Sequence, residues 1–174
     1  SSAVLYRSDD SGENWSGLTV IARGKPKTRS YAEPVLMELT PGHLLCMLRV
    51  GNDAGSALPG LFWQNESLDH GISWTTPKPT GIQSGACPRL LKLADGRLLL
   101  TYGRRFEPYG LYASLSEDDG RTWSKTSWLL RKTPDGDQGY TSSIELEEGR
   151  IFTTSYAKNA RGTTGITGTY WSLP

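Results

Sequence analysis

The sequence predicts an all-β fold, and three observations carry that prediction. The 174 residues include 20 glycines, 10 prolines, 6 tryptophans and 8 tyrosines, which favours strands and turns over helices. No stretch longer than about ten residues keeps the 3.6-residue period of an amphipathic helix. Short β-rich runs recur instead between Gly, Pro, Asp and Ser. These runs are Glu33–Leu39, His43–Val50, Leu61–Glu66, Pro88–Leu93, Arg97–Tyr102, Leu111–Leu115, Ser143–Leu146, Arg150–Tyr156 and Gly165–Trp171.

Composition excludes several classes of function. Lys and Arg number 19 against 18 Asp and Glu, and this net charge of +1 argues against a strongly basic nucleic-acid binder. No run of apolar residues is long enough to predict a membrane-spanning helix. His43 and His70 are distant turn residues, so neither a metal site nor a cofactor is expected. Cys46 and Cys87 fit either two buried thiols or a disulfide, which leaves the cellular compartment open.

Two interleaved motifs repeat along the chain and predict its architecture. The first has the form S-x-D-x-G-x-x-W and occupies residues 8–15, 67–74 and 116–123. The second is a turn between two apolar runs, at Leu39–Leu45, Leu93–Leu99 and Leu146–Phe152, with its glycines 54 and 53 residues apart. A unit of about 50 residues that contains two hairpins corresponds to one four-stranded blade of a β-propeller.

The residues of the first motif have structural roles. Its Ser and Asp can accept hydrogen bonds from the amides of their own turn, its Gly permits the reversal, and its Trp folds back as an apolar plug. The carboxylates of Asp10, Asp69 and Asp118 are therefore interpreted as structural groups that hold their own hairpin turns, and not as general acids.

Counting strands divides the chain into four units: 1–24 as the end of one blade, 31–82 and 86–131 as complete blades, and 140–174 as the last blade. A closed ring of six such blades needs about 300 residues. We therefore expect a partial propeller, either the C-terminal half of a larger one or a half-ring that closes as a homodimer.

The S-x-D-x-G-x-x-W motif is the Asp box, and further stretches resemble bacterial sialidases. They are Tyr31–Val35 leading to Met47–Arg49, Leu100–Arg105, Asp137–Leu146 and the C-terminal Thr169–Pro174. The resemblance covers nearly the whole chain and matches the second half of that family in the same order. It implies a sialidase-type β-propeller that is six-bladed when complete.

The resemblance also implies a set of site residues. Tyr140 matches the tyrosine nucleophile of sialidases, and Glu33 matches the glutamate that takes its proton. Because the ordinary pKa of a tyrosine is about 10, the phenol needs such a base. Arg49 and Arg105, with Arg104 as the alternative to Arg105, match two of the three arginines that grip the carboxylate of the substrate.

Other interpretations of these residues stay open from the sequence. Tyr140 could be a core aromatic, Glu33 a rim residue, and Arg49 a surface charge. Glu33 opens an apolar strand and Arg49 closes the next, however, so both should lie at the same end of a hairpin. Asp137 could orient a substrate hydroxyl or cap its turn. Strand alternation should point only one of the two adjacent arginines inward.

The sequence thus predicts a sialidase-like exo-glycoside hydrolase that removes a terminal, acidic sugar with retention, its partner being a carbohydrate. The family's first arginine and its acid/base aspartate come from N-terminal blades, so one copy of this chain is expected to be catalytically incomplete. The alternative is a non-catalytic propeller that binds a glycan or protein, or associates with itself. A contact between the Tyr140 hydroxyl and the Glu33 carboxylate, with Arg49 and Arg105 directed at one point, favours the hydrolase.

Overall fold

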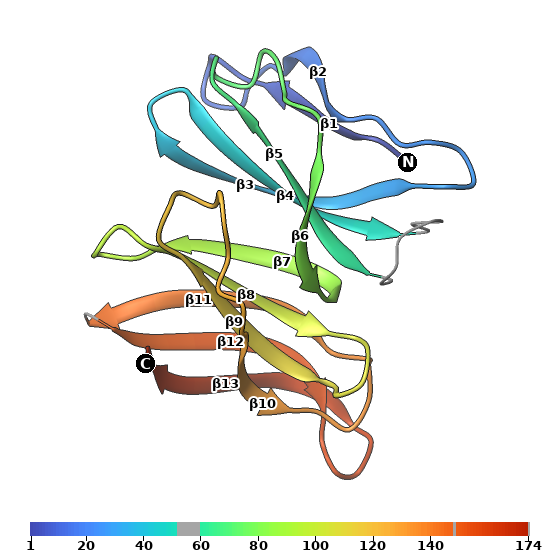
Figure 1. Cartoon of the computed structure of the whole chain (residues 1–174), viewed down its shortest axis with the longest axis vertical. Helices are drawn as coiled ribbons and strands as arrows, with labels where there is room; N and C mark the ends of the chain where they lie inside the picture. The colour runs from blue at the N-terminus through green and yellow to red at the C-terminus, as the bar shows by residue number, and fades with distance from the viewer. Residues whose placement is uncertain (52–59, 148, 174) are drawn as a thin grey trace.

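The computed structural model describes residues 1–51, 60–147 and 149–173, and this part of the chain forms strands and turns without helix. Residues 52–59 of the expected 31–82 unit, Glu148 of the third turn motif and Pro174 of the C-terminal motif lie outside the described residues. The described strands form four antiparallel sheets (Figure 1). The first sheet is the hairpin of β1 (Ala3–Arg7) and β2 (Ser16–Ala22).

The other three sheets are meanders in which each strand pairs with the next along the chain. The second contains β3 (Ser30–Thr40), β4 (His43–Gly51), β5 (Leu61–Ser67) and β6 (Lys78–Gln83). The third contains β7 (Gly85–Lys92), β8 (Leu98–Arg104), β9 (Gly110–Ser116) and β10 (Trp128–Lys132). The last contains β11 (Gly139–Glu147), β12 (Arg150–Lys158) and β13 (Thr164–Ser172).

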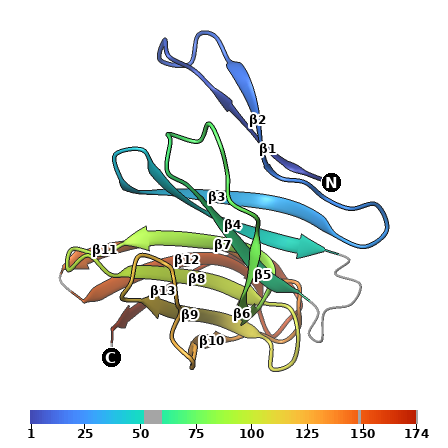
Figure 2. The same cartoon turned by 45° about the horizontal axis from the view of Figure 1, so that its top comes forward.

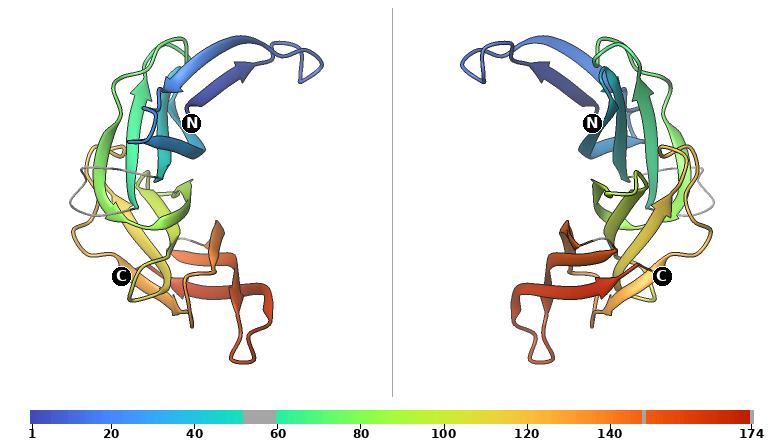
Figure 3. Two further views of the ribbon diagram at one scale, coloured as in Figure 1. Left: turned by 90° about the vertical axis from the view of Figure 1, so that its right-hand side faces the viewer. Right: turned by 90° about the vertical axis from the view of Figure 1, so that its left-hand side faces the viewer.

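The sheets follow one another around an arc (Figure 3). The hairpin β1–β2 lies beyond β3 at one end, and the sheet β11–β13 lies at the other (Figure 2). The first strands of successive sheets are neighbours, because β7 contacts both β3 and β11. This arrangement brings the starts of three strands that are distant in sequence to the same side of the molecule. The described residues contain no helix long and apolar enough to cross a membrane.

The Ser and Asp of each Asp box hold their own turn by hydrogen bonds, as the box at the end of β5 (residues 67–74) illustrates. Ser67 Oγ donates to Asp69 Oδ1 at 2.8 Å and accepts from the amide of Gly71 at 2.8 Å. Asp69 accepts from both the hydroxyl and the amide of Ser73. The Ser73 hydroxyl is the main cause that lowers the pKa of Asp69 to about 2. The Asp69 carboxylate is thus fully engaged in hydrogen bonds within its own turn, as expected of a structural residue.

The tryptophan of a box packs against the preceding sheet. Trp123 Nε1 donates to Gln64 Oε1 on β5 at 2.8 Å, while Gln64 Nε2 donates to the carbonyl of Gly120. Trp74 packs with the apolar cluster between the first two sheets. Trp15 differs, because the described chain has no sheet before β1 and its side chain is 64% exposed. Trp15 still folds back on its own turn as expected, since its Nε1 donates to the carbonyl of Gly12 at 3.1 Å, but within the described residues its ring is not buried.

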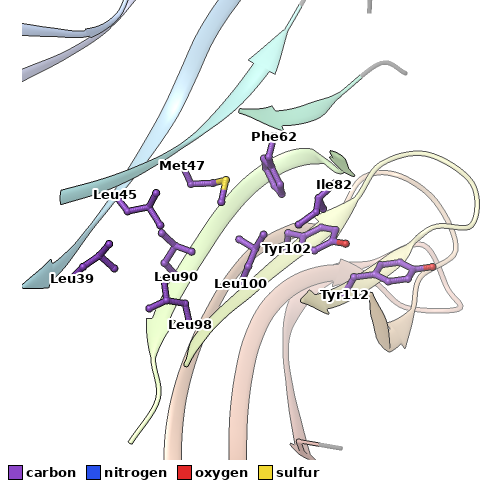
Figure 4. Packing of buried hydrophobic residues seen from close by; sticks show 10 residues of the cluster. All are labelled: Leu39, Leu45, Met47, Phe62, Ile82, Leu90, Leu98, Leu100, Tyr102 and Tyr112. Atoms are coloured by element: carbon purple, nitrogen blue, oxygen red, sulfur yellow. The ribbon is translucent and has the colours of Figure 1, made fainter. Parts of the chain in front are cut away.

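Apolar side chains fill the space between neighbouring sheets. Leu45, Met47 and Phe62 of the second sheet face Leu98 and Leu100 of the third (Figure 4). The interface between the third and last sheets adds buried hydroxyls, which run in a hydrogen-bonded chain from Thr101 through Ser143 to Thr153. Such satisfied polar contacts fix the relative position of the two sheets. Both cysteines are free: Cys46 is buried and Cys87 half-buried.

Candidate functional site

The first strand of each of the three larger sheets carries a β-bulge near its start, on the right-hand side of Figure 1. At these bulges Glu33, Gly85 and Tyr140 adopt positive φ angles of 49°, 79° and 49°. A bulge re-aims side chains relative to the regular pleat. Glycine is the ordinary residue for this backbone region, so Glu33 and Tyr140 hold an uncommon and costly conformation.

Glu33 connects two of the expected site residues. Its Oε1 accepts a hydrogen bond from the Tyr140 hydroxyl at 2.5 Å and another from Arg49 Nη1 at 2.8 Å. The bond to Glu33 is the first cause that raises the pKa of Tyr140, so the phenol is neutral and its proton points at a carboxylate. The second oxygen of Glu33, Oε2, is buried and accepts no hydrogen bond from the described residues.

The two adjacent arginines point in different directions. Arg105 donates through Nε to the carbonyl of Gln138 at 3.2 Å and through Nη2 to the Tyr156 hydroxyl at 2.7 Å, and its Cζ lies 5.8 Å from the centre of the Tyr140 ring. Arg104 donates to Gln83 and to the carbonyl of Glu107 instead. Arg105 therefore flanks Tyr140, and Arg104 does not join that group.

Asp137 lies beside Arg105 in an exposed ionic network. Its carboxylate accepts from Lys158 Nζ and from the Tyr156 hydroxyl, each at 3.1 Å. The bond to Lys158, followed by that to Tyr156, lowers the pKa of Asp137. The residue that caps this turn is Asp135 and not Asp137, because Asp135 Oδ1 accepts a hydrogen bond from the amide of Asp137 at 2.9 Å.

Gln138 and Tyr156 support the site, and neither was singled out from the sequence. Gln138 is fully buried, and its side-chain amide donates to the main-chain carbonyl of Arg104 at 2.7 Å. The main-chain carbonyl of Gln138 accepts the hydrogen bond from Arg105 Nε. Tyr156 lies opposite Gly139 in the hairpin of β11 and β12. Counting residues outward from the turn at Gly149 would have placed this tyrosine beside the site.

Two further features help to delimit the site. Burial, and then the charge of Glu33, raise the pKa of the Cys87 thiol, which therefore stays protonated next to the site. A hollow of about 660 Å³ lies around Asp118 and Trp128, at the Asp-box end of the third sheet. Since Tyr140 begins β11 at the other end of the strands, that hollow takes no part in the candidate site.

Comparison with known proteins decides the family. The model of the BNR repeat-like domain matches residues 1–153, which is most of the chain. The chain belongs to the BNR repeat-like domain family. The anhydrosialidase of Macrobdella decora is 28% identical to this chain, and the match covers 91% of the chain. The chain spans only 22% of that curated relative.

Solved structures share the fold of the BNR chain. A protein of unknown function from Dyadobacter fermentans matches 99% of the chain with a TM-score of 0.81 and 25% identity, and the match covers 46% of that protein. The NanB sialidase of Streptococcus pneumoniae matches 99% of the chain with a TM-score of 0.68 and 19% identity, over 27% of its own length. An α-L-arabinanase from Penicillium chrysogenum matches 96% with a TM-score of 0.67 and 19% identity, over 54% of its own length.

These matches confirm the sialidase-type β-propeller fold and the relationship to the sialidase superfamily that the Asp boxes predicted. They support a glycosidase-family relationship for the BNR chain. The roles of Tyr140, Glu33, Arg49, Arg105 and Asp137 stay predictions, and so does a bacterial source.

Proposed function

We propose that this chain contributes the nucleophile and part of the carboxylate clamp of a sialidase-like exo-glycosidase. The observation that carries the proposal is the 2.5 Å hydrogen bond from the Tyr140 hydroxyl to Glu33 Oε1. Tyrosine nucleophiles set sialidases apart from most other glycosidases. A tyrosine that only fills a core has no need of a carboxylate at its hydroxyl, and Tyr140 is 49% exposed.

The proposed chemistry uses this pair directly. The Tyr140 oxygen forms a bond to the anomeric carbon while the bond from that carbon to the leaving oxygen breaks, and Glu33 takes the phenolic proton. A carboxylic acid from other blades of the propeller protonates the leaving oxygen. Water then attacks the anomeric carbon from the face that the leaving group left, and the carboxylate from the other blades takes a proton from that water. The bond to the Tyr140 oxygen breaks, Glu33 returns the phenolic proton, and the two inversions give net retention. A neutral phenol also approaches an anionic sugar without the repulsion that a carboxylate would meet.

The two arginines give the proposal its substrate class. Arg49 is paired with Glu33, the residue that accepts the Tyr140 hydrogen bond, and the Arg105 guanidinium carbon lies 5.8 Å from the centre of the Tyr140 ring. Guanidinium groups stay charged and match a carboxylate with two parallel hydrogen bonds. We therefore propose a terminal acidic sugar as the substrate. The alternative of a binding propeller does not require the contact between Tyr140 and Glu33.

The test is hydrolysis of a fluorogenic sialoside by the closed propeller, that is, this chain together with the blades that supply the acid, with binding of free sialic acid as a second measurement. Tyr140→Phe should lower turnover by at least about a hundredfold, because the nucleophile is lost, and should leave sialic acid binding nearly unchanged. Tyr170→Phe is the matched control, since that side chain is 70% exposed on the last sheet. Turnover that survives Tyr140→Phe would refute the proposal, and binding without any turnover would favour the binding propeller.

A further inference from the structure

The peptide unit between Arg104 and Arg105 is held from two sides, where the three larger sheets meet. Its carbonyl, which belongs to Arg104, accepts a hydrogen bond from the side-chain amide of Gln138 at 2.7 Å. Its N–H, which belongs to Arg105, donates to the carbonyl of Ser84 at 2.6 Å, between β6 and β7. Gln138 and Ser84 are fully buried, so water does not compete for these bonds. The direction in which the Arg105 side chain leaves the backbone is therefore fixed.

Arg105 holds Gln138 in return. Its Nε donates to the main-chain carbonyl of Gln138 at 3.2 Å. The side chain of Gln138 thus binds the main chain of Arg104, while the side chain of Arg105 binds the main chain of Gln138. This reciprocal pair of bonds joins the end of β8 to the segment that leads into β11. Loss of the Gln138 amide would loosen both partners.

The two residues that follow, Gly139 and Tyr140, have positive φ angles of 127° and 49°. Gly139 fits tightly between Ala86 and Gly103. A Cβ on Gly139 would lie 3.1 Å from the Cβ of Ala86, and a Cβ on Gly103 would lie 2.7 Å from the Cα of Gly139. The chain therefore enters the bulge at Tyr140 from a position that close packing defines. The direction of the tyrosine side chain depends on the same contacts that hold the end of β8.

We propose that Gln138 is a positioning residue, which sets Tyr140 and Arg105 in one geometry so that the nucleophile and the carboxylate clamp act on the same sugar. The inference rests on the proposed function. Because Gln138 is fully buried, its effect on a substrate passes through these two neighbours. A misplacement of reacting groups by about 1 Å can lower a rate by about a hundredfold.

A purely structural role fits Gln138 less well. Its Oε1 is buried and has no hydrogen-bond partner among the described residues. An unpaired buried polar atom lowers stability, so the amide is not an efficient way to fill this space. Gln64, the buried glutamine between the second and third sheets, differs because both its side-chain oxygen and its side-chain nitrogen are paired.

The experiment compares these two glutamines in the closed propeller. Gln138→Met keeps the length of the side chain and removes the amide. Turnover of a fluorogenic sialoside should fall at least about tenfold, and the affinity for sialic acid at least about threefold, because the nucleophile and the clamp are no longer held. Gln64→Met is the matched control at the Asp-box end of the strands. It should keep both values, although it breaks two hydrogen bonds.

A spectroscopic measurement is independent of turnover. The bond from the Tyr140 hydroxyl to Glu33 is the first cause that raises the pKa of Tyr140. An NMR titration of ring-labelled tyrosine, assigned with Tyr140→Phe, therefore reports whether the hydroxyl still meets Glu33. Gln138→Met should bring the pKa of Tyr140 down toward the ordinary value of about 10, and Gln64→Met should not. Gln138→Asn, whose shorter amide does not reach Arg104, is the second variant if Gln138→Met does not fold.

The outcomes separate the positioning role from the proposed function. If Tyr140→Phe leaves turnover intact while Gln138→Met still lowers the pKa of Tyr140, the proposed function fails and the positioning role stands. An unchanged pKa of Tyr140 in Gln138→Met overturns the positioning role, even if the affinity for sialic acid falls, since Gln138 would then orient Arg105 alone. Equal effects of Gln64→Met and Gln138→Met also overturn it, because general loss of stability would explain both.

Discussion

Tyr140 and Glu33 occupy backbone positions that glycine usually takes. Both have φ at 49°, and the matching position in β7 is Ala86, directly after Gly85, whose φ is 79°. A left-handed conformation costs a non-glycine residue about 1–3 kcal/mol. The chain accepts this cost at the two positions where a bulge turns a side chain toward its partner. Strain of this kind is common where side-chain direction matters more than stability.

The first prediction concerns the stability of the fold at Tyr140. Tyr140→Asn should leave the free energy of unfolding within about 0.5 kcal/mol of the parent, because Asn tolerates positive φ and the tyrosine is already 49% exposed. Tyr31→Asn is the matched change at a tyrosine that is 4% exposed and packed edge-on against Trp63, and it should cost about 3 kcal/mol. Urea unfolding measures both. An equal loss at the two positions would identify Tyr140 as a core aromatic.

The second prediction concerns Tyr156, which holds Arg105 without a role in the reaction itself. Tyr156→Phe removes the hydroxyl that accepts from Arg105 at 2.7 Å and donates to Asp137 at 3.1 Å. The affinity for sialic acid should fall about five- to tenfold, because Arg105 is no longer oriented. Titration calorimetry measures this, with Tyr6→Phe, an exposed tyrosine on β1, as the control. Unchanged affinity would leave Tyr156 with a structural role only.

At the scale of elements, the Asp boxes predict a dependence of stability on pH. The pKa of Asp69 is lowered from 3.8 to about 2 in the folded state, so the ionised carboxylate stabilises the fold. That contribution is complete above the unfolded pKa and is lost as the pH falls through about 2. The melting temperature of Asp69→Asn should therefore lie below that of the parent at pH 6, and the gap should narrow from pH 4 to pH 2. A difference in melting temperature that stays constant from pH 4 to pH 2 would contradict a stabilising role of the ionised Asp69.

Not every strand was visible in the sequence. The nine runs named from composition correspond to nine of the thirteen described strands, and β1, β2, β6 and β10 were not among them. β6 contains Pro79 and Gly81, which weaken a strand assignment. Both residues are tolerated there because β6 lies at the edge of its sheet and pairs on one side only. Local composition thus misses a strand such as β6, whose Pro and Gly obscure its pattern, more readily than an apolar strand.

At the scale of the whole molecule, Gln64 joins the second sheet to the third. The side chain is 1% exposed, accepts from Trp123 and donates to Gly120. Gln64→Leu should lower the free energy of unfolding by about 2 kcal/mol, because it leaves a buried donor and a buried acceptor unpaired. Thr126→Val, at an exposed position in the connection before β10, should change it by less than about 0.5 kcal/mol. A small effect of Gln64→Leu would show that apolar packing alone holds the sheets together.

The two ends of the arc carry exposed apolar side chains. At the hairpin end these are Tyr6, Trp15 and Leu18, and on the last sheet Ile166 and Tyr170 are 80% and 70% exposed. Exposed apolar faces of this kind favour association. Pairing with a second copy or with further blades stays a prediction.

The fold class and the repeat follow from local features of the sequence, because turn chemistry and strand alternation are local and the residues of the Asp box specify the hydrogen bonds of their own turn. The sequence also placed Glu33 and Arg49 at one end of a hairpin, since register follows from the turn at Gly42. Only the tertiary structure decided that Tyr140 reaches Glu33 across 107 residues of chain. That contact, and the choice of Arg105 over Arg104, depend on how three sheets pack around an arc, and no local pattern encodes the angle between sheets.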